Sequence, residues 1–266
     1  MFKRILLKLS GEYLAGELEE GIKSTSHFDE TVVERIVGEI KTLHSQGVEI
    51  SIVIGGGNFW RGAAAPDFMD RVNADNIGML ASVMNGIYLS DWFFNKNIDA
   101  RVLTPVPMGA TETYSRDTAN DYLKKGRILI FAGGTGHPFF STDTIAAIRG
   151  AELNVDCVLF AKGVEGVCDI NPKNLNIGET YGVYREISYA KMIKDNLGVI
   201  DIAAMQILMQ QKVYSVLFDI RANGSITDAC RNDNKIMEIG TKIYYDKDEK
   251  WEEEICQNKQ LYTKKK

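Results

Sequence analysis

Short apolar runs alternate with helical patterns along most of this chain. The runs Ile5–Leu9, Val48–Ile54 and Arg127–Phe131 have the length and apolar character of buried strands. Between them, segments such as Phe28–Gln46 and Met69–Phe94 carry apolar residues at helical spacing. Strands that alternate with helices predict a parallel sheet covered by helices on both faces. The expected fold class is therefore α/β, a three-layer αβα sandwich with a mainly parallel central sheet.

Glycines follow directly on three of the predicted strands, at Ser10-Gly11, Gly55–Gly57 and Gly133–Gly136. Loops at the carboxyl ends of parallel strands open on one edge of the sheet, where such folds bind their ligands. A backbone without Cβ lets a ligand lie close to its amides, and the helix after the third loop favours an anion at its start. This pattern indicates one shared site for a phosphorylated small molecule. Ordinary strand-to-helix turns are the alternative interpretation.

Lys8 and Arg61 are the candidate cations of this site. Lys8 interrupts an apolar strand, where a buried ammonium needs an anionic partner, unless the strand is an edge and the lysine reaches water. Arg61 follows the glycine triplet with a planar guanidinium that suits phosphate, although a surface arginine beside a tight turn would look the same. Neither the common P-loop motif nor a complete G-x-G-x-x-G is present, and three scattered histidines do not favour a histidine-based metal site.

Composition excludes several functional classes. A formal net charge of -5 argues against a nucleic-acid binder, and no segment is long and apolar enough to span a membrane. The four cysteines show no C-x-x-C spacing, which is typical of reduced thiols in the cytoplasm. We expect a cytoplasmic protein with neither nucleic acid nor membrane as a partner. Residues 1–245 should form a single domain with two lobes, and the densely charged residues 246–266 a tail.

Four motifs together are similar to those of the bacterial uridylate kinases in the amino acid kinase family. They are K-L-S-G-E, I-G-G-G-N-x-x-R-G, the helix R-V-N-A-D-N-I-G-M-L-A-S-V-M-N-G, and T-G-H-P-F-F-S-T-D. The resemblance extends to about Tyr245, and the helix motif separates uridylate kinases from carbamate, acetylglutamate and aspartate kinases. It implies an amino acid kinase-like fold whose N-terminal lobe holds UMP and whose C-terminal lobe holds ATP.

The resemblance implies ATP-dependent phosphorylation of UMP to UDP in pyrimidine nucleotide biosynthesis. Lys8, Arg61 and Asp143 would be catalytic, with the two cations neutralising charge and Asp143 orienting Lys8. The residues implied for ATP are Lys8, Leu9, Ser10, Gly11, Gly57, Arg61 and Asn171. Those implied for UMP are Gly56, Asp75, Thr135, Gly136, His137, Pro138, Phe139, Phe140, Ser141 and Thr142. Mg²⁺ would arrive with ATP, held by phosphates and water rather than by protein ligands.

The chemistry agrees with this assignment. The phosphate of UMP has a second pKa of about 6, so it is largely dianionic at neutral pH and needs no general base. In-line phosphoryl transfer then consists of alignment and charge neutralisation. A site that offers cations and backbone amides, without a candidate histidine base, is sufficient for this reaction.

Several positions depart from the family pattern. His137 replaces an asparagine, Lys162 a threonine or asparagine, Cys168 an aromatic residue and Asn171 an aspartate. The altered adenine side leaves open a protein that senses UMP or UTP without catalysis, and a carbamate or amino acid kinase on the same fold is a third alternative. The resemblance also implies a homohexamer and allows inhibition by UTP. Gly16–Gly21 lacks the glycine-aromatic-glycine ending of the loop linked to GTP activation, so we do not expect activation by GTP.

Overall fold

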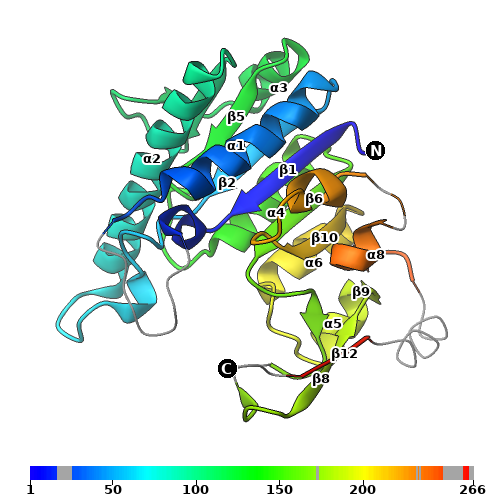
Figure 1. Cartoon of the computed structure of the whole chain (residues 1–266). Helices are drawn as coiled ribbons and strands as arrows, with labels where there is room; N and C mark the ends of the chain where they lie inside the picture. Colours follow the sequence, from blue (N-terminus) through cyan, green and yellow to red (C-terminus); the bar gives the residue numbers. More distant parts are fainter. Residues whose placement is uncertain (17–25, 172–173, 232, 234, 248–259, 264–266) are drawn as a thin grey trace.

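A computed structural model describes residues 1–16, 26–171, 174–231, 233, 235–247 and 260–263 (Figure 1). Within these residues, a large sheet contains the strands β1 (Arg4–Leu9), β2 (Glu49–Ile54), β3 (Ala100–Thr104), β4 (Glu112–Thr113), β5 (Ile128–Phe131), β6 (Cys157–Lys162), β9 (Glu186–Ser188), β10 (Tyr214–Asp219) and β11 (Gly240–Tyr244). Their order across the sheet is β4-β3-β5-β2-β1-β6-β10-β11-β9. Every neighbouring pair is parallel except β10 with β11. The predicted α/β class with a mainly parallel sheet is confirmed.

Helices pack on both faces of this sheet and complete three layers. The first face packs against α1 (Glu30–Ser45), α2 (Arg71–Asn95), α7 (Ser225–Ala229) and α8 (Lys235–Ile239). The second face packs against α3 (Arg116–Lys124), α4 (Thr142–Glu152), α5 (Tyr189–Lys194) and α6 (Ile202–Gln210). None of the helices in the described part of the chain combines the length and apolar character that crossing a membrane requires.

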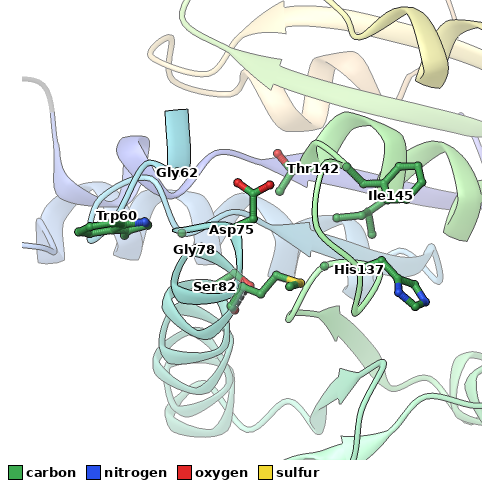
Figure 2. A pocket seen from close by; sticks show the side chains of 12 residues that line it. Trp60, Gly62, Asp75, Gly78, Ser82, His137, Thr142 and Ile145 are labelled. Carbon is green, nitrogen blue, oxygen red and sulfur yellow. Dashed lines mark hydrogen bonds between the residues drawn. The ribbon is translucent and has the colours of Figure 1, made fainter. Parts of the chain in front are cut away.

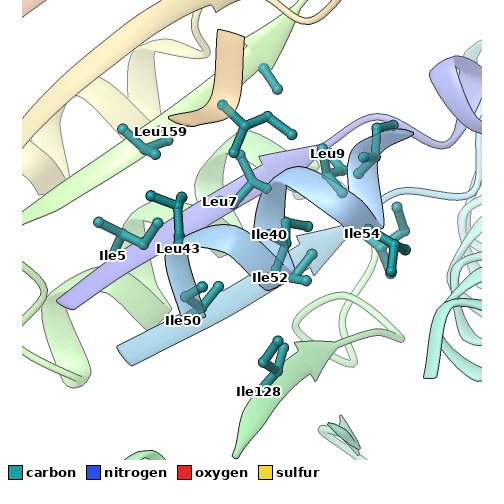
Figure 3. Packing of buried hydrophobic residues seen from close by; sticks show 14 of the residues in the cluster. Ile5, Leu7, Leu9, Ile40, Leu43, Ile50, Ile52, Ile54, Ile128 and Leu159 are labelled. Carbon is teal, nitrogen blue, oxygen red and sulfur yellow. The ribbon is translucent and has the colours of Figure 1, made fainter. Parts of the chain in front are cut away.

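The central strand β1 shows how the sequence divides between the two faces. Ile5 and Leu7 point to the first face, where they pack with Ile40 of α1 (Figure 3). Leu6 belongs to the cluster on the second face. Because successive side chains of a strand alternate, Lys8 points to the same face as Leu6, toward α4.

Asp29 and Asp70 start the two long helices of the first face. Each carboxylate accepts hydrogen bonds from backbone N–H groups in the first turn of its helix, those of α1 and α2 respectively. Such caps satisfy N–H groups that have no partner within the helix. The cap at Asp70 fixes the first turn of α2, so Asp75 lies where its carboxylate faces the loop that follows β5.

A second, three-stranded sheet contains β7 (Val167–Cys168), β8 (Thr180–Tyr184) and β12 (Gln260–Thr263), and it lies at the bottom of the view in Figure 1. The sequence did not predict it, because residues 161–182 are polar and the tail is densely charged. Gln260–Thr263 nevertheless pairs antiparallel with β8, and Tyr262 stacks on Tyr181 with ring centroids 5.9 Å apart. These four residues of the predicted tail therefore form a strand. Most of the tail, and most of the predicted acidic connector Gly16–Gly21, lie outside the described residues.

Candidate active site

The loops after β1 and β2 meet the start of α4 at one edge of the sheet. Gly55 donates its backbone N–H to Leu9 across 3.0 Å. A Cβ on Gly11 would lie 2.5 Å from the carbonyl oxygen of Gly55, and one on Gly55 would lie 3.4 Å from the Thr142 side chain. Glycine is required at position 11 because any larger residue would strike the neighbouring backbone.

A buried ion cluster lies at this edge. Asp143, the second residue of α4, is 7% exposed and Lys8 is 4% exposed. Lys8 Nζ lies 3.1 Å from Asp143 Oδ1, as an ion pair rather than a well-directed hydrogen bond, and it donates to Ser10 Oγ across 2.8 Å. Lys162 Nζ lies 2.7 Å from Asp143 Oδ2 and also donates to the carbonyl oxygen of Val199. One carboxylate therefore holds two ammonium groups.

The pKa values of this cluster reflect burial and charge together. Burial raises the pKa of Asp143, but the charges of Lys8 and Lys162 outweigh it and hold this pKa below its ordinary value of 3.8. Burial lowers the pKa of Lys162 below its ordinary value of 10.5, Asp143 opposes this shift, and Lys8 adds to it. Asp143 is therefore ionised at neutral pH and available to the two lysines.

A pocket of about 140 Å³ adjoins the cluster (Figure 2). It is lined by Gly56, Trp60, Gly62, Asp75, Gly78, Met79, Ser82, Gly134, His137, Phe140, Thr142 and Ile145. In Figure 2, Asp75 and Ser82 come from α2, whereas Thr142 comes from the start of α4. Because Thr142 lines the pocket and Asp143 follows it directly, the pocket and the ion cluster share the first turn of α4.

The loop between β5 and α4 forms one wall of this pocket. Gly133, Gly134 and Gly136 have φ values of 76°, 64° and 79°, a left-handed conformation that glycine adopts without strain. The backbone N–H of Gly133 donates to Ser82 Oγ across 2.8 Å, which ties the loop to α2. At its other end, Ser141 caps α4 by accepting the N–H of Thr144.

Asp75 contacts this loop from the opposite wall. Its Oδ2 accepts the backbone N–H of Phe139 across 2.9 Å, and its Oδ1 lies 2.9 Å from Arg71 Nε. Phe139 has a φ of 72°, which is rare for a residue with a side chain, so this contact holds the loop in a strained conformation.

Arg61 is placed differently from the other predicted cation. Its guanidinium forms an ion pair with Glu12, the two side chains being 59% and 42% exposed. Glu12 also lies against Gly57, where a Cβ would meet its carboxylate oxygen at 2.7 Å. Arg61 is not among the residues that line the pocket, although its neighbours Trp60 and Gly62 are.

Asn171 lies in a second pocket of about 510 Å³. Cys168 and Val199 are among its lining residues. Val199 accepts a hydrogen bond from Lys162, so this pocket is connected to the ion cluster through one side chain. Burial raises the pKa of the Cys168 thiol to about 12, which keeps this thiol protonated and unreactive at neutral pH.

The structure thus brings eight of the implied residues into two adjacent groups. Around the pocket are Gly56, Asp75, His137, Phe140 and Thr142, and beside it are Lys8, Ser10 and Asp143. Thr135, Gly136, Pro138, Phe139 and Ser141 belong to the same loop, but only their neighbours line the pocket. The roles of all these residues, and those of Leu9, Gly11, Gly57, Arg61 and Asn171, stay predictions.

Three contacts at the site were not predicted. Two are ion pairs, that of Lys162 with Asp143 and that of Glu12 with Arg61. The third is a hydrogen bond of 2.6 Å that the hydroxyl of Ser141 donates to Asp201 Oδ2. The sequence signalled only the first, because Lys162 replaces a threonine or asparagine of the family pattern.

Comparison with known proteins identifies the family. A sequence model of the amino acid kinase family matches residues 3–219, well over half of the chain. The chain belongs to the amino acid kinase family. Within that family, the expected resemblance to the bacterial UMP kinases is confirmed by solved structures.

The UMP kinase from Bacillus anthracis is 36% identical, with a TM-score of 0.82 over 92% of this chain and 97% of that one. The UMP kinase from Ureaplasma parvum is 30% identical, with a TM-score of 0.80 over 91% and 98%. The uridylate kinase from Archaeoglobus fulgidus, 21% identical with a TM-score of 0.68 over 90% and 99%, shows the same fold. These similarities support a phosphotransferase of the amino acid kinase family.

Proposed function

We propose that this chain phosphorylates UMP to UDP with ATP as the donor, a step of pyrimidine nucleotide biosynthesis. The observation that carries the proposal is the position of the ion cluster beside the small pocket. Thr142 lines that pocket, and the next residue, Asp143, holds Lys8. A pocket for an acceptor next to a buried cation is what phosphoryl transfer requires, since catalysis depends on alignment and charge neutralisation.

The pocket walls offer groups that suit a nucleoside monophosphate. The carboxylate of Asp75 accepts hydrogen bonds and can take those of ribose hydroxyls once the N–H of Phe139 releases it. The glycine loop offers backbone amides at a position that a phosphate can approach closely. Thr142 adds a hydroxyl at the end of the pocket nearest to Asp143.

On the donor side, Lys8 neutralises the transferring phosphoryl group, with Ser10 and the first glycine loop beside it. Arg61 would leave Glu12 to contact the ATP phosphates. An exposed ion pair of this kind contributes only about 0–1 kcal/mol, so little opposes its exchange. Mg²⁺ enters as part of the donor, MgATP, because phosphate oxygens and water are its usual ligands. The dianionic phosphate of UMP attacks without a general base.

The second pocket favours catalysis over a protein that only senses UMP or UTP. It lies next to Lys162 and is lined by Asn171, one of the residues implied for ATP, so the chain retains room for a donor base despite the altered residues there. The similarity to two UMP kinases at 30% identity or more favours UMP over carbamate or an amino acid as the acceptor.

An ADP-release assay with UMP, CMP, AMP and carbamate tests the proposal. We expect turnover with UMP far above that with the others. Strong activity on CMP or carbamate and none on UMP would refute the acceptor assignment. Tight UMP binding in calorimetry without measurable ATP binding would instead establish the sensor. Repeating the assay with GTP and with UTP measures regulation; we propose inhibition by UTP and no activation by GTP.

Assembly and location complete the proposal. A homohexamer and a cytoplasmic location follow from the resemblance and from the composition, and both stay predictions.

A further inference from the structure

Two lysines share one carboxylate at the edge of the sheet where the glycine loops meet. Strands β1 and β6 pair in parallel with Lys8 opposite Phe160, so Lys162, two residues further along β6, lies on the same face as Lys8. From this face the two ammonium groups contact different oxygens of Asp143, at 3.1 and 2.7 Å. The register of the sheet therefore places both lysines against the first turn of α4.

The charges of this cluster do not balance. With both lysines protonated, two positive charges face one negative charge, and the three side chains are at most 19% exposed. Asp201, the residue that precedes α6, is a nearby carboxylate, but it is exposed and already accepts hydroxyl hydrogen bonds from Ser141 and Thr144. Burial lowers the pKa of Lys162, as expected for a cation without a full counter-charge. The cluster has an excess positive charge that an added anion would balance.

The second lysine changes what Lys8 can do. If Lys8 alone faced Asp143, the pair would be neutral. A phosphate could then bind Lys8 only by competing with the buried carboxylate of Asp143. Lys162 holds Oδ2 of Asp143 and the carbonyl oxygen of Val199, so the carboxylate stays ionised and fixed when Lys8 turns to a phosphate. Val199 also lines the second pocket, which places Lys162 between the expected donor base and Lys8.

We propose that Lys162 is a positioning residue for phosphoryl transfer: it holds Asp143 and supplies the additional positive charge that lets Lys8 bind the donor phosphates. The inference rests on the proposed function only in taking a nucleoside triphosphate as the donor. Because the family pattern has threonine or asparagine at this position, the device belongs to this chain rather than to the motif.

The test is calorimetry with a non-hydrolysable ATP analogue and Mg²⁺, which needs no acceptor. Lys162→Met should weaken binding of the analogue by roughly ten- to a hundredfold, the range of one charge-assisted contact. Lys162→Arg, which keeps the charge, should retain most of the affinity. Lys124→Met, at an exposed lysine that ends α3, is the matched control and should bind as the unchanged protein does.

A charge rescue separates this role from packing. The double variant Lys162→Met with Asp143→Asn leaves Lys8 as the only charge of the cluster, so it should bind the analogue more tightly than Lys162→Met alone. Absence of this recovery would overturn the proposal, as would a folded Lys162→Met protein with unchanged affinity, or an unchanged protein that does not bind the analogue.

A measurement on the unchanged protein covers the case in which Lys162→Met does not fold. At alkaline pH below 10.5, binding of the analogue should take up protons, because a phosphate raises the lowered pKa of Lys162. Calorimetry in buffers of different ionisation enthalpy measures this uptake, and its absence would overturn the proposal. A protein that binds the analogue in the expected pattern but does not phosphorylate UMP would refute the proposed function and leave this inference intact.

Discussion

Among single residues, Lys8 offers the most direct test of the transfer step. It is buried against Asp143 and Ser10 and does not line the small pocket. Lys8→Met should lower kcat by about 10²- to 10³-fold, the range for loss of one preorganised electrostatic group. UMP binding, measured by calorimetry, should survive. The control Lys124→Met should leave turnover unchanged. Unchanged turnover in Lys8→Met would remove Lys8 from the mechanism.

The lowered pKa of Lys162 predicts a dependence of stability on pH. The unfolded chain binds this proton more tightly than the folded one, so between the folded pKa and 10.5 the free energy of unfolding rises with pH. Below the pKa that Lys162 has in the folded protein, this group lowers the free energy of unfolding by a constant amount. Lys162→Met lacks this group, so its stability relative to the unchanged protein should be highest near neutral pH and should decline toward pH 10.5. Urea denaturation at several pH values measures this difference; a difference that does not change with pH contradicts the shift.

The ion pairs of the site differ in whether the sequence predicts them. The pairing of Asp143 with Lys8 was predicted, because the motifs that contain them resemble a known family. The ion pair of Lys162 with Asp143 depends on β6 lying beside β1 in one register, and that of Glu12 with Arg61 depends on how two loops fold back. Contacts of this kind arise between segments whose separate patterns carry no information about each other.

At the scale of elements, close packing between the second glycine loop and α2 shapes the small pocket. A Cβ on Gly56 would lie 2.6 Å from the carbonyl oxygen of Gly78 and 2.7 Å from the Cβ of Ala81. Gly56→Ala should therefore push α2 outward, lower the free energy of unfolding by about 1–3 kcal/mol and weaken UMP binding.

Gly38→Ala on α1 is the matched control, because a Cβ there meets nothing within 4 Å. It should stabilise the protein by up to about 1 kcal/mol, since alanine favours a helix more than glycine does. Thermal denaturation of Gly56→Ala and Gly38→Ala measures their stability, and calorimetry with UMP measures their affinity for it. Equal behaviour of the two would show that the packing at Gly56 is not restrictive.

The small sheet joins the last described strand to the second pocket. Arg185 donates to the hydroxyl of Tyr262 across 2.6 Å, and Tyr262 stacks on Tyr181 of β8. This strand pairs with β7, which contains Cys168. Tyr262→Ala should raise KM for ATP with little change in KM for UMP, because Cys168 of this sheet lines the second pocket, which we propose for the donor, whereas no described residue of the sheet lines the small pocket. Steady-state kinetics with each substrate varied in turn measure the two KM values. Leu261→Ala is the control, since that side chain is 74% exposed, and an equal effect from it would contradict the role of Tyr262.

Long elements could be predicted from the sequence and short ones could not. The periodic pattern located α1 and α2 to within two residues at each end, and the apolar runs located β1 and β2. The strands β7, β8 and β12 have only two, five and four residues, and they form because they pair with one another. Such pairing depends on tertiary structure, so the local sequence pattern of each strand does not predict it.

At the scale of the whole molecule, α2 presents an apolar surface. Ile77, Leu80 and Met84 follow one another at helical spacing and are 36%, 54% and 47% exposed. If copies of the chain assemble through this face into the predicted homohexamer, Leu80→Arg should reduce the mass in solution. Light scattering measures it, with Lys124→Glu as the control. A hexamer that withstands Leu80→Arg would place the interface elsewhere.

The position of β1 in the middle of the sheet constrains how the chain is made. Ile5 lies opposite Ile50 on one side and Cys157 on the other. During synthesis the first strand therefore gains one neighbour early, and it waits for the second until more than half of the polypeptide has left the ribosome. A nascent chain interrupted before that point exposes a hydrophobic strand edge, which is prone to aggregate.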